Sequence, residues 1–223
     1  ADKHFQKQIQ EMPIKLVYFN GRGLAEITRY MLSIAGVDFE DYRYPITADF
    51  KRPEFDAAKS LYPENMGRIP ILEVDGKKIG QSSTIARYVA KKYGFAGSDE
   101  IEEALNDMYF EHVRDIKDAY QKVRGITNEA EKTAAMEKWF ATDLPEWLGK
   151  LEASIVGTGG FAVGTKLSLA DITIYYFLTT FFDNKEGAKK AYEAQPKLSA
   201  IVAATAAHEG IKAWEAKRPV TPF

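Results

Sequence analysis

The sequence predicts an α/β domain followed by an all-helical domain, and three observations carry this prediction. Residues 14–44 show a strand, helix and strand in succession. Further along, two short apolar runs flank Asp75-Gly76, and an Asp-Gly pair between apolar runs favours a β-hairpin. Beyond residue 100 the strand patterns stop, and apolar residues recur at helical spacing.

The first segment is expected to be a βαβ unit. Residues 14–19 form an apolar run that Gly21 and Gly23 end. One helix face follows, with Gly36 as its expected C-terminal stop; its members are Ile27, Tyr30, Met31, Ile34 and Ala35. Residues 37–44 have a strand pattern, so a parallel pair of strands with a crossover helix is favoured.

The second segment is expected to be irregular and then to form a ββα unit. Residues 47–67 are polar, with a short helix expected around 54–60. The hairpin around Asp75-Gly76 follows, and we expect Ser82 or Ser83 to cap a helix that ends near Gly94. The order βαβ-ββα is the thioredoxin-like arrangement, a mixed sheet with helices on its faces.

The second half of the chain is expected to be helical. One long stripe begins at Glu100, and His112 and Asp115 lie on it where apolar residues would be expected; its apolar members are Ile101, Leu105, Met108, Ile116, Ala119 and Val123. Asn128 and Glu131 are expected to start a second helix, which would run to about Val156 with a kink near Pro145.

A third helix start lies at Ser168. Ser168 is expected to be the N-cap with Asp171 at the third helical position, and Leu167 would pack on Ile172. We assign Asp171 to folding and not to catalysis. Since the helix after it is apolar nearly all round, it should form the core of this domain. The predicted division is an extension over 1–12, a thioredoxin-like domain over 13–92, a linker over 93–99 and an all-helical domain over 100–223.

Composition excludes several classes of function. The 223 residues include 30 Lys and Arg against 32 Asp and Glu, so no basic field favours nucleic acid or an anionic membrane. No apolar run approaches the ~20 residues that a membrane span needs, and residues 1–6 lack the apolar core of a signal peptide. We therefore expect a cytoplasmic protein. The sequence has no cysteine, and its three histidines show no ligand spacing, so no metal site is predicted.

Five motifs give the sequence a family resemblance. They are Val17-Tyr18-Phe19-Asn20-Gly21-Arg22-Gly23 followed by Ala25-Glu26, Ile69-Pro70-Ile71-Leu72-Glu73-Val74-Asp75-Gly76, Gln81-Ser82 followed by Ile85-Ala86-Arg87-Tyr88, Ser168-Leu169-Ala170-Asp171, and Lys217-Arg218-Pro219-Val220. In this order the chain resembles the cytosolic glutathione transferases, and within them the sigma class. That class includes glutathione-dependent prostaglandin D synthases and the S-crystallins.

The resemblance implies an enzyme that conjugates the thiolate of glutathione to small hydrophobic electrophiles. Two alternatives stay open. One is an isomerase of the prostaglandin D synthase kind, for which glutathione is a cofactor. The other is a weakly active, S-crystallin-like or ligand-binding protein.

Tyr18 is the residue to which the resemblance gives the catalytic role. Its hydroxyl would donate a hydrogen bond to the glutathione sulfur. A free thiol has a pKa of about 8.5, and a donor that prefers the charged form lowers it. A shift of about two units would correspond to roughly 2.7 kcal/mol. The alternative is an aromatic residue at a strand end that packs on the core.

The resemblance also implies the residues that bind glutathione. Gln81 and Ser82 would hold the γ-glutamyl end of glutathione. Ser82 would bind the carboxylate of that end, because a helix N-terminus favours an anion. The Ile69-Pro70 bond would be cis, and Ile69 would pair with the cysteinyl part. The full expected set is Tyr18, Phe50 in the place of a family tryptophan, Lys59 (or else Lys51), Arg68, Ile69, Pro70, Gln81, Ser82 and, from the other subunit of a homodimer, Asp115.

The electrophile pocket would be formed by residues from both domains. The set implied is Phe19, Leu24, Lys117, Tyr120, Gln121 and Phe223. Leu24 departs from the family, which usually has an arginine there that helps to polarise the tyrosine. Arg22 is the candidate to replace part of that function. For Asp115 the alternative is a solvated position on a helix edge.

Overall fold

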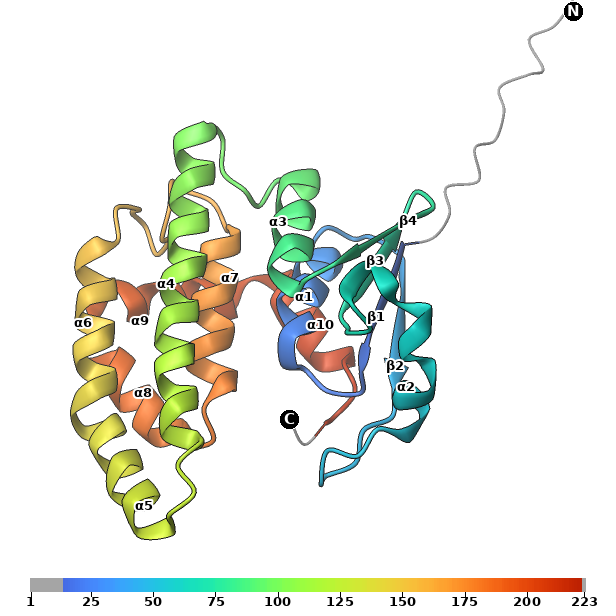
Figure 1. The fold of residues 1–223 in the computed structure, drawn as a ribbon. Coiled ribbons are helices and arrows are strands. Elements are labelled where there is room, and N and C mark those ends of the chain that lie inside the picture. Colours follow the sequence, from blue (N-terminus) through green and yellow to red (C-terminus); the bar gives the residue numbers. More distant parts are fainter. Residues whose placement is uncertain (1–13, 222–223) are drawn as a thin grey trace, which may run out of the picture. The chain divides into compact units, whose positions relative to one another are not determined.

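The computed structural model describes residues 14–221, and their contacts divide the chain into two compact units. The sheet unit contains residues 14–25, 36–85 and 220–221, and the helical unit contains residues 26–35 and 86–219. Figure 1 labels their elements. The expected extension over 1–12 lies outside the described residues. No helix between residues 14 and 221 is long and apolar enough to cross a membrane.

The sheet unit is built on four strands in the order β2-β1-β3-β4. They are β1 (Ile14–Phe19), β2 (Phe39–Tyr44), β3 (Ile71–Val74) and β4 (Lys77–Gly80). β1 runs parallel to β2 and antiparallel to β3, and β3 runs antiparallel to β4. The mixed sheet of a thioredoxin-like domain is therefore confirmed. Leu16 and Val17 are fully buried at its centre.

The predicted hairpin joins β3 and β4. Asp75 and Gly76 have φ values of 49° and 71°, and positive φ at both central residues defines the turn that matches strand twist. The helix expected around 54–60 is α2 (Pro53–Ala58), continued by a 3₁₀ turn at Lys59–Leu61. A second 3₁₀ turn, Pro63–Asn65, follows.

The expected cap of the next helix is wrong by one residue. Helix α3 (Ser82–Tyr93) begins at Ser82, and the Ile85 N–H donates to the carbonyl of Gln81. Gln81, and neither Ser82 nor Ser83, is thus the residue that flanks the helix. Its φ of 66° is unusual for a residue with a side chain.

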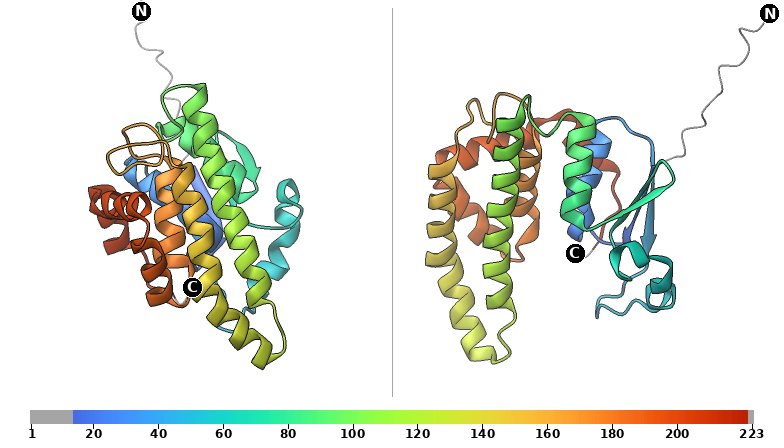
Figure 2. Two further views of the ribbon diagram at one scale, coloured as in Figure 1. Left: turned by 90° about the vertical axis from the view of Figure 1, so that its left-hand side faces the viewer. Right: turned by 45° about the horizontal axis from the view of Figure 1, so that its top comes forward.

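The helical unit consists of α1, most of α3 and the later helices. Their bounds are α1 (Glu26–Ile34), α4 (Glu100–Arg124), α5 (Glu129–Lys138), a π-helical turn at Trp139–Asp143, α6 (Leu144–Ser154), α7 (Leu169–Tyr176), a second π-helical turn at Phe177–Phe181, α8 (Lys185–Glu193), α9 (Pro196–Ala207) and α10 (Glu209–Lys217). Figure 2 shows α4, α6 and α7 running side by side. The expected kink near Pro145 corresponds to the first π-helical turn.

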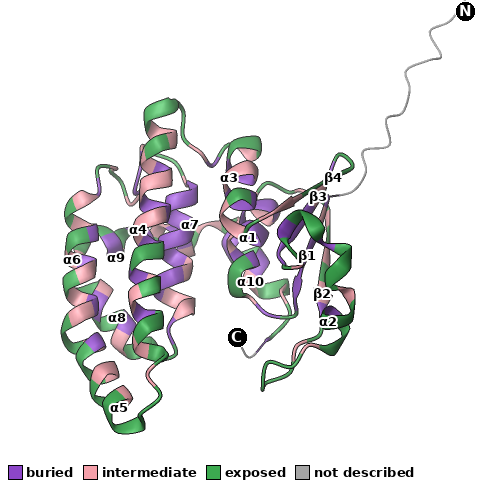
Figure 3. Cartoon of the chain, in the orientation of Figure 1, coloured by how far each residue is buried: buried purple, intermediate pink, exposed green. Residues whose placement is uncertain are grey.

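Helix α7 forms the core of the helical unit, as predicted. Every residue from Leu169 to Tyr175 is buried, and Figure 3 shows this helix in the colour of buried residues. Both halves of the predicted capping box at Ser168 and Asp171 are present. The predicted cap of α5 is confirmed as well, since the Asn128 side chain accepts from the Glu131 N–H.

The predicted apolar stripe of α4 is mostly wrong. Of its members only Ile116 is buried, and Ile101 is 71% exposed. The helix instead buries a neighbouring face; it carries Asn106, Tyr109, Phe110, Val113, Ile116 and Tyr120. Asn106 can be buried because its side chain donates to the carbonyls of Ala96 and Glu102. The core side of α4 therefore carries three large aromatic side chains together with Val113 and Ile116.

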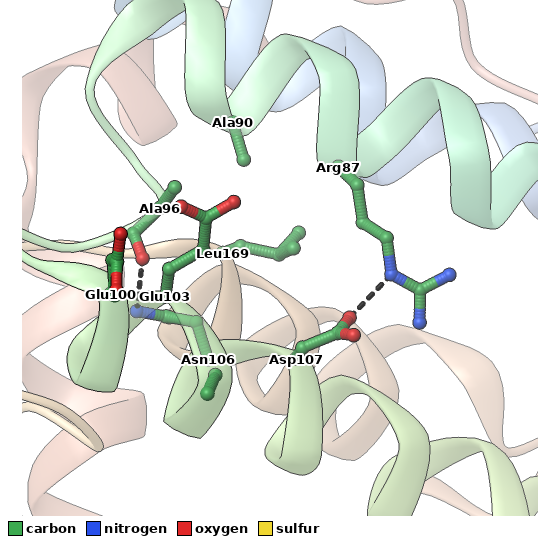
Figure 4. Close-up of a pocket in the computed structure, with 9 residues that line it drawn as sticks. Arg87, Ala90, Ala96, Glu100, Glu103, Asn106, Asp107 and Leu169 are labelled. Atoms are coloured by element: carbon green, nitrogen blue, oxygen red, sulfur yellow. Dashed lines mark hydrogen bonds and ion pairs between the residues drawn. The ribbon is translucent and has the colours of Figure 1, made fainter.

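Two clusters of hydrogen bonds and ion pairs connect helices within the helical unit. The buried Glu26 carboxylate of α1 accepts hydrogen bonds from Trp214 Nε1 at 2.8 Å and from Arg218 at 2.9 Å, which ties α1 to α10. Arg87 of α3 pairs with Asp107 and Glu111 of α4. Figure 4 shows the Arg87–Asp107 pair at the edge of a cavity between these helices.

Candidate functional site

Tyr18 lies near the end of β1, and a loop folds back over its hydroxyl. The loop comprises residues 20–24, and its Leu24 N–H donates to Tyr18 Oη at 3.2 Å. Gly23 permits this approach, since its φ is 42° and a Cβ there would lie 2.7 Å from Tyr18 Oη. In this bond the phenol oxygen is the acceptor, and a phenol hydroxyl has the chemistry to donate as well. The geometry thus provides a hydrogen-bond donor at the strand end.

A cavity of about 510 Å³ opens beside this phenol. Its lining comes entirely from the sheet unit and consists of Tyr18, Phe19, Leu24, Arg52, Phe55, Lys59, Met66, Gly67, Arg68 and Ile69. Six of these are residues that the sequence predicted for the site, namely Tyr18, Phe19, Leu24, Lys59, Arg68 and Ile69. Three of the lining residues carry a positive charge, so the cavity suits an anionic ligand.

The segment that carries Arg68 and Ile69 is held by Asn65. Its side-chain Nδ2 donates to the carbonyls of Arg68 and Pro70, both at 3.1 Å, and Asn65 is buried. The Ile69-Pro70 peptide bond is cis, as expected. The Asn65 side chain therefore holds the backbone of residues 68–70 next to the cavity.

The sequence left open whether Lys59 or Lys51 belongs to the glutathione site, and the two lysines differ in their position relative to the cavity. Lys59 lines the cavity and pairs with Asp56 at 2.6 Å. Lys51 lies outside the lining and pairs with the exposed Asp49 at 2.7 Å. Lys59 is therefore better placed than Lys51. Phe50, expected to contact glutathione, is 62% exposed and is not part of the lining.

Sequence reasoning missed four lining residues, of which Arg52 is the most informative. The Arg52 guanidinium lies over the rings of Phe19 and Phe55, at 5.4 and 5.7 Å from their centroids. The only available signal was its position just before Pro53, where a proline often starts a helix. That signal indicates an element boundary and does not indicate a cavity. The others are Phe55, Met66 and Gly67.

Gln81 and Ser82 lie outside the lining of this cavity. Ser82 is the first residue of α3, and the first N–H groups of a helix have no partner within the helix. Gln81 immediately precedes it in the left-handed conformation. Both residues therefore lie at the start of α3.

The other predicted residues belong to the helical unit or lie outside the described chain. Asp115 is exposed and lines a groove of about 240 Å³ between α4 and α6. Gln121 is exposed on α4, and Phe223 lies beyond the described residues. Lys117 is half-buried with its Nζ 5.4 Å from the centroid of the Phe181 ring. Burial lowers the pKa of the Lys117 ammonium, and the Asp118 carboxylate opposes this.

The Tyr120 side chain has no solvent-exposed surface that a ligand could contact. It is fully buried against the rings of Trp139, Phe140 and Phe182, all of the helical unit. The structure therefore assigns Tyr120 to the core, and its expected place in an electrophile pocket is corrected. The reason is that Tyr120 lies on the buried face of α4, beside Ile116. Within residues 14–221, no group of His, Cys, Asp or Glu side chains could hold a metal ion.

Fold and site together define a class of protein: a thioredoxin-like sheet unit with a strand-end tyrosine, a cis-proline segment and a positively lined cavity, in one chain with a helical unit. Two family profiles match this chain. Residues 14–91 match the glutathione S-transferase N-terminal domain, and residues 114–218 match the glutathione S-transferase C-terminal domain. The chain belongs to the glutathione S-transferase family.

Its relatives include enzymes and a lens protein. Glutathione S-transferase S1 of Drosophila melanogaster is 34% identical over 94% of this chain and 82% of its own length. Hematopoietic prostaglandin D synthase of Gallus gallus is 34% identical over 93% of this chain and 97% of its own. S-crystallin SL11 of Nototodarus sloanii is 32% identical over 93% and 98%.

Solved structures of the family have the same fold. Monomeric Na-GST-3 of Necator americanus matches with a TM-score of 0.81 at 31% identity, over 95% of this chain and 100% of that one. A sigma-class glutathione S-transferase of Fasciola hepatica matches with a TM-score of 0.77 at 27% identity, over 95% and 99%. These relatives support the resemblance to the sigma class.

Proposed function

We propose that this protein conjugates the thiolate of glutathione to small hydrophobic electrophiles, with the Tyr18 hydroxyl as the donor that stabilises the thiolate. The observation that carries the proposal is the position of this hydroxyl. It borders a cavity and already accepts from the Leu24 N–H. A phenol hydroxyl can donate to sulfur as well as accept, and accepting a hydrogen bond polarises the hydroxyl further.

The cavity has the chemistry that glutathione requires. Glutathione carries two carboxylates, and Arg52, Lys59 and Arg68 line the cavity. We assign Lys59 and Arg68 to the peptide's charged groups, and Ile69 and Pro70 to its cysteinyl part. Arg52 is an addition to the predicted set.

The γ-glutamyl end is assigned to the start of α3. Gln81 and Ser82 would bind it there, because the free N–H groups and the dipole of a helix N-terminus favour a carboxylate. Phe50 is the weakest member of the set, since its exposed ring offers apolar contact and no hydrogen bond.

Leu24 replaces the side chain that usually helps the tyrosine, but its backbone supplies a donor. The Leu24 N–H donates to Tyr18 Oη at 3.2 Å, and we propose that this neutral donor helps to polarise the hydroxyl. A neutral amide stabilises less than a guanidinium would. We therefore expect activation of the thiol to be weaker than with an arginine at this place.

Within the sheet unit, Phe19 and Leu24 are proposed to contact the electrophile. Leu24 is 44% exposed, so its side chain is available to an apolar substrate. Phe223 stays a proposed member. The same thiolate would serve an isomerase, the activity that the name of the Gallus gallus relative indicates.

A homodimer is proposed on the evidence of α4. The aliphatic stripe that was expected to be core stays half-exposed or exposed along Ile101, Leu105 and Met108. Asp115 continues this stripe, where it would reach the glutathione of a second subunit and pair with its amine. The structure of Na-GST-3 is described as monomeric, so the oligomeric state of this protein is to be measured by light scattering.

We also propose a cytoplasmic location, a role in detoxification and a domain boundary within residues 93–99.

The function is tested by glutathione binding and turnover together. Wild-type protein should be retained on immobilised glutathione and should conjugate a generic aryl halide. Retention without turnover would favour an S-crystallin-like role. Leu24 and Phe50, which replace the usual arginine and tryptophan of the family, are the residues that support this alternative. Absence of both would contradict the proposal.

A further inference from the structure

The loop over Tyr18 is attached to the sheet unit at several points. It comprises residues 20–24, and we call it the Tyr18 loop. At its start the Asn20 N–H donates to the Tyr44 carbonyl at 2.8 Å, and the Gly21 N–H donates to the Phe19 carbonyl at 2.7 Å. At its end the Leu24 N–H donates to Tyr18 Oη. Between these anchors only Arg22 carries a long polar side chain.

Arg22 attaches the middle of the loop to a segment far away in sequence. Its Nη1 donates to the Thr221 carbonyl at 2.8 Å and lies 3.4 Å from Thr221 Oγ1. Thr221 is buried, whereas its neighbour Val220 is fully exposed. Both partners belong to the sheet unit, although 199 residues separate them. A charged donor on a part-buried carbonyl is among the stronger hydrogen bonds.

The position of the loop decides the position of the Leu24 amide. Gly23 adopts a left-handed conformation directly above the phenol, with no room for a Cβ. A shift of the loop would therefore move the Leu24 N–H that donates to Tyr18 Oη. Displacements of about 1 Å at a reacting group can cost roughly 100-fold in rate.

We propose that Arg22 and Thr221 form a clasp that positions the Tyr18 loop, so that the Leu24 N–H stays directed at the Tyr18 hydroxyl and glutathione is ionised efficiently. The inference rests on the proposed function, because it takes Tyr18 as the thiol-ionising donor. Arg22 and Thr221 are positioning residues and do not touch glutathione. Arg22 thereby gains a role different from the direct replacement of the family arginine.

A double-mutant cycle with a thiol titration tests this clasp. The variants are Arg22→Gln, Tyr18→Phe and the pair, and the readout is the ultraviolet absorbance of the thiolate of bound glutathione across pH. Arg22→Gln should raise the pKa of the bound thiol by about one unit, a tenfold loss of thiolate below that pKa. Added to Tyr18→Phe, it should change the thiolate fraction by less than twofold, because residues acting through one group are not additive.

Three further variants separate positioning from general stability. Lys15→Gln removes the ion pair of Lys15 with Glu40 at the beginning of the same strand and should leave the titration unchanged. Arg22→Lys keeps one cationic donor for the Thr221 carbonyl and should recover part of the effect. Thr221→Val removes only the longer contact and should raise the thiol pKa least.

The outcomes distinguish the inference from the function on which it rests. If Arg22→Gln lowers the melting temperature but leaves the thiol titration in place, the clasp is only structural and the inference is overturned. Equal effects of Arg22→Gln with and without Tyr18 would also overturn it. If Tyr18→Phe alone fails to change the titration, the proposed function of Tyr18 fails first. Should Arg22→Gln not fold, Arg22→Lys and Thr221→Val give the same comparison.

Discussion

The capping box at α7 and the loop over Tyr18 are both short motifs, but they differ in what their hydrogen bonds fix. In the box, Asp171 is fully buried, and its carboxylate accepts from the Ala162 N–H, the Ser168 N–H and the Ser168 hydroxyl. In the loop, Gly23 and Leu24 remain exposed, and the Leu24 N–H donates to the Tyr18 hydroxyl. A buried network of this kind specifies a fold, whereas the loop orients one hydroxyl beside a cavity. The two motifs should therefore respond differently to substitution.

The largest effect is expected from Asp171→Ala. It would leave two buried backbone N–H groups without acceptors, at about 1–3 kcal/mol each. We expect a loss of about 3–5 kcal/mol in the free energy of unfolding, measured by urea denaturation. Bound glutathione in the protein that still folds should titrate as in wild type. A changed thiol titration would show that the box acts on the site as well.

Asp171 also predicts a pH dependence of stability. Burial raises the pKa of this carboxyl to about 6, above the ordinary 3.8 of the unfolded chain. The folded state then binds the proton more tightly, so this contribution is fully present below about pH 3.8 and is lost as the pH rises through 6. About two pKa units correspond to roughly 3 kcal/mol. The free energies of unfolding of wild type and Asp171→Asn, measured by urea denaturation between pH 4 and 7, should diverge by about this amount, and parallel curves would contradict it.

A smaller loss of stability but a clear loss of function is expected from Gly23→Ala. The left-handed conformation costs a residue with a Cβ about 1–2 kcal/mol, and this Cβ would meet Tyr18 Oη. We expect a rise in the pKa of bound glutathione and at least a tenfold lower kcat/KM. Gly36→Ala is the matched control, since Gly36 has a φ of 65° and nothing within 4 Å of an added Cβ. Gly36→Ala should lose a similar amount of stability and keep its activity. If Gly36→Ala and Gly23→Ala lose activity equally, the effect of Gly23→Ala comes from backbone strain and not from contact with Tyr18.

Local patterns predicted most of the fold. The hairpin at Asp75-Gly76 and the capping box at Ser168 each depend on residues adjacent in sequence, and both are confirmed. The buried face of α4 was not predictable in this way. Asn106 is buried there because two of its partners, the Ala96 carbonyl and the Ala170 N–H, come from other segments.

The candidate site was predictable only in part. The family resemblance implied Tyr18, Lys59 (or else Lys51), Arg68 and Ile69, and the structure places Tyr18, Lys59, Arg68 and Ile69 around one cavity. The Leu24 amide was missed, because a backbone donor is not visible in the identity of a side chain. Thr221 was missed for another reason: its contact with Arg22 joins positions 199 residues apart.

The account depends most on the donor role of Tyr18. The direct measurement is the pKa of glutathione bound to Tyr18→Phe, followed by thiolate absorbance across pH, beside the same titration of wild type. We predict that the pKa of the bound thiol rises by about two units toward the free value of about 8.5, while glutathione stays bound. An unchanged pKa with glutathione bound would contradict the central claim that Tyr18 ionises the thiol.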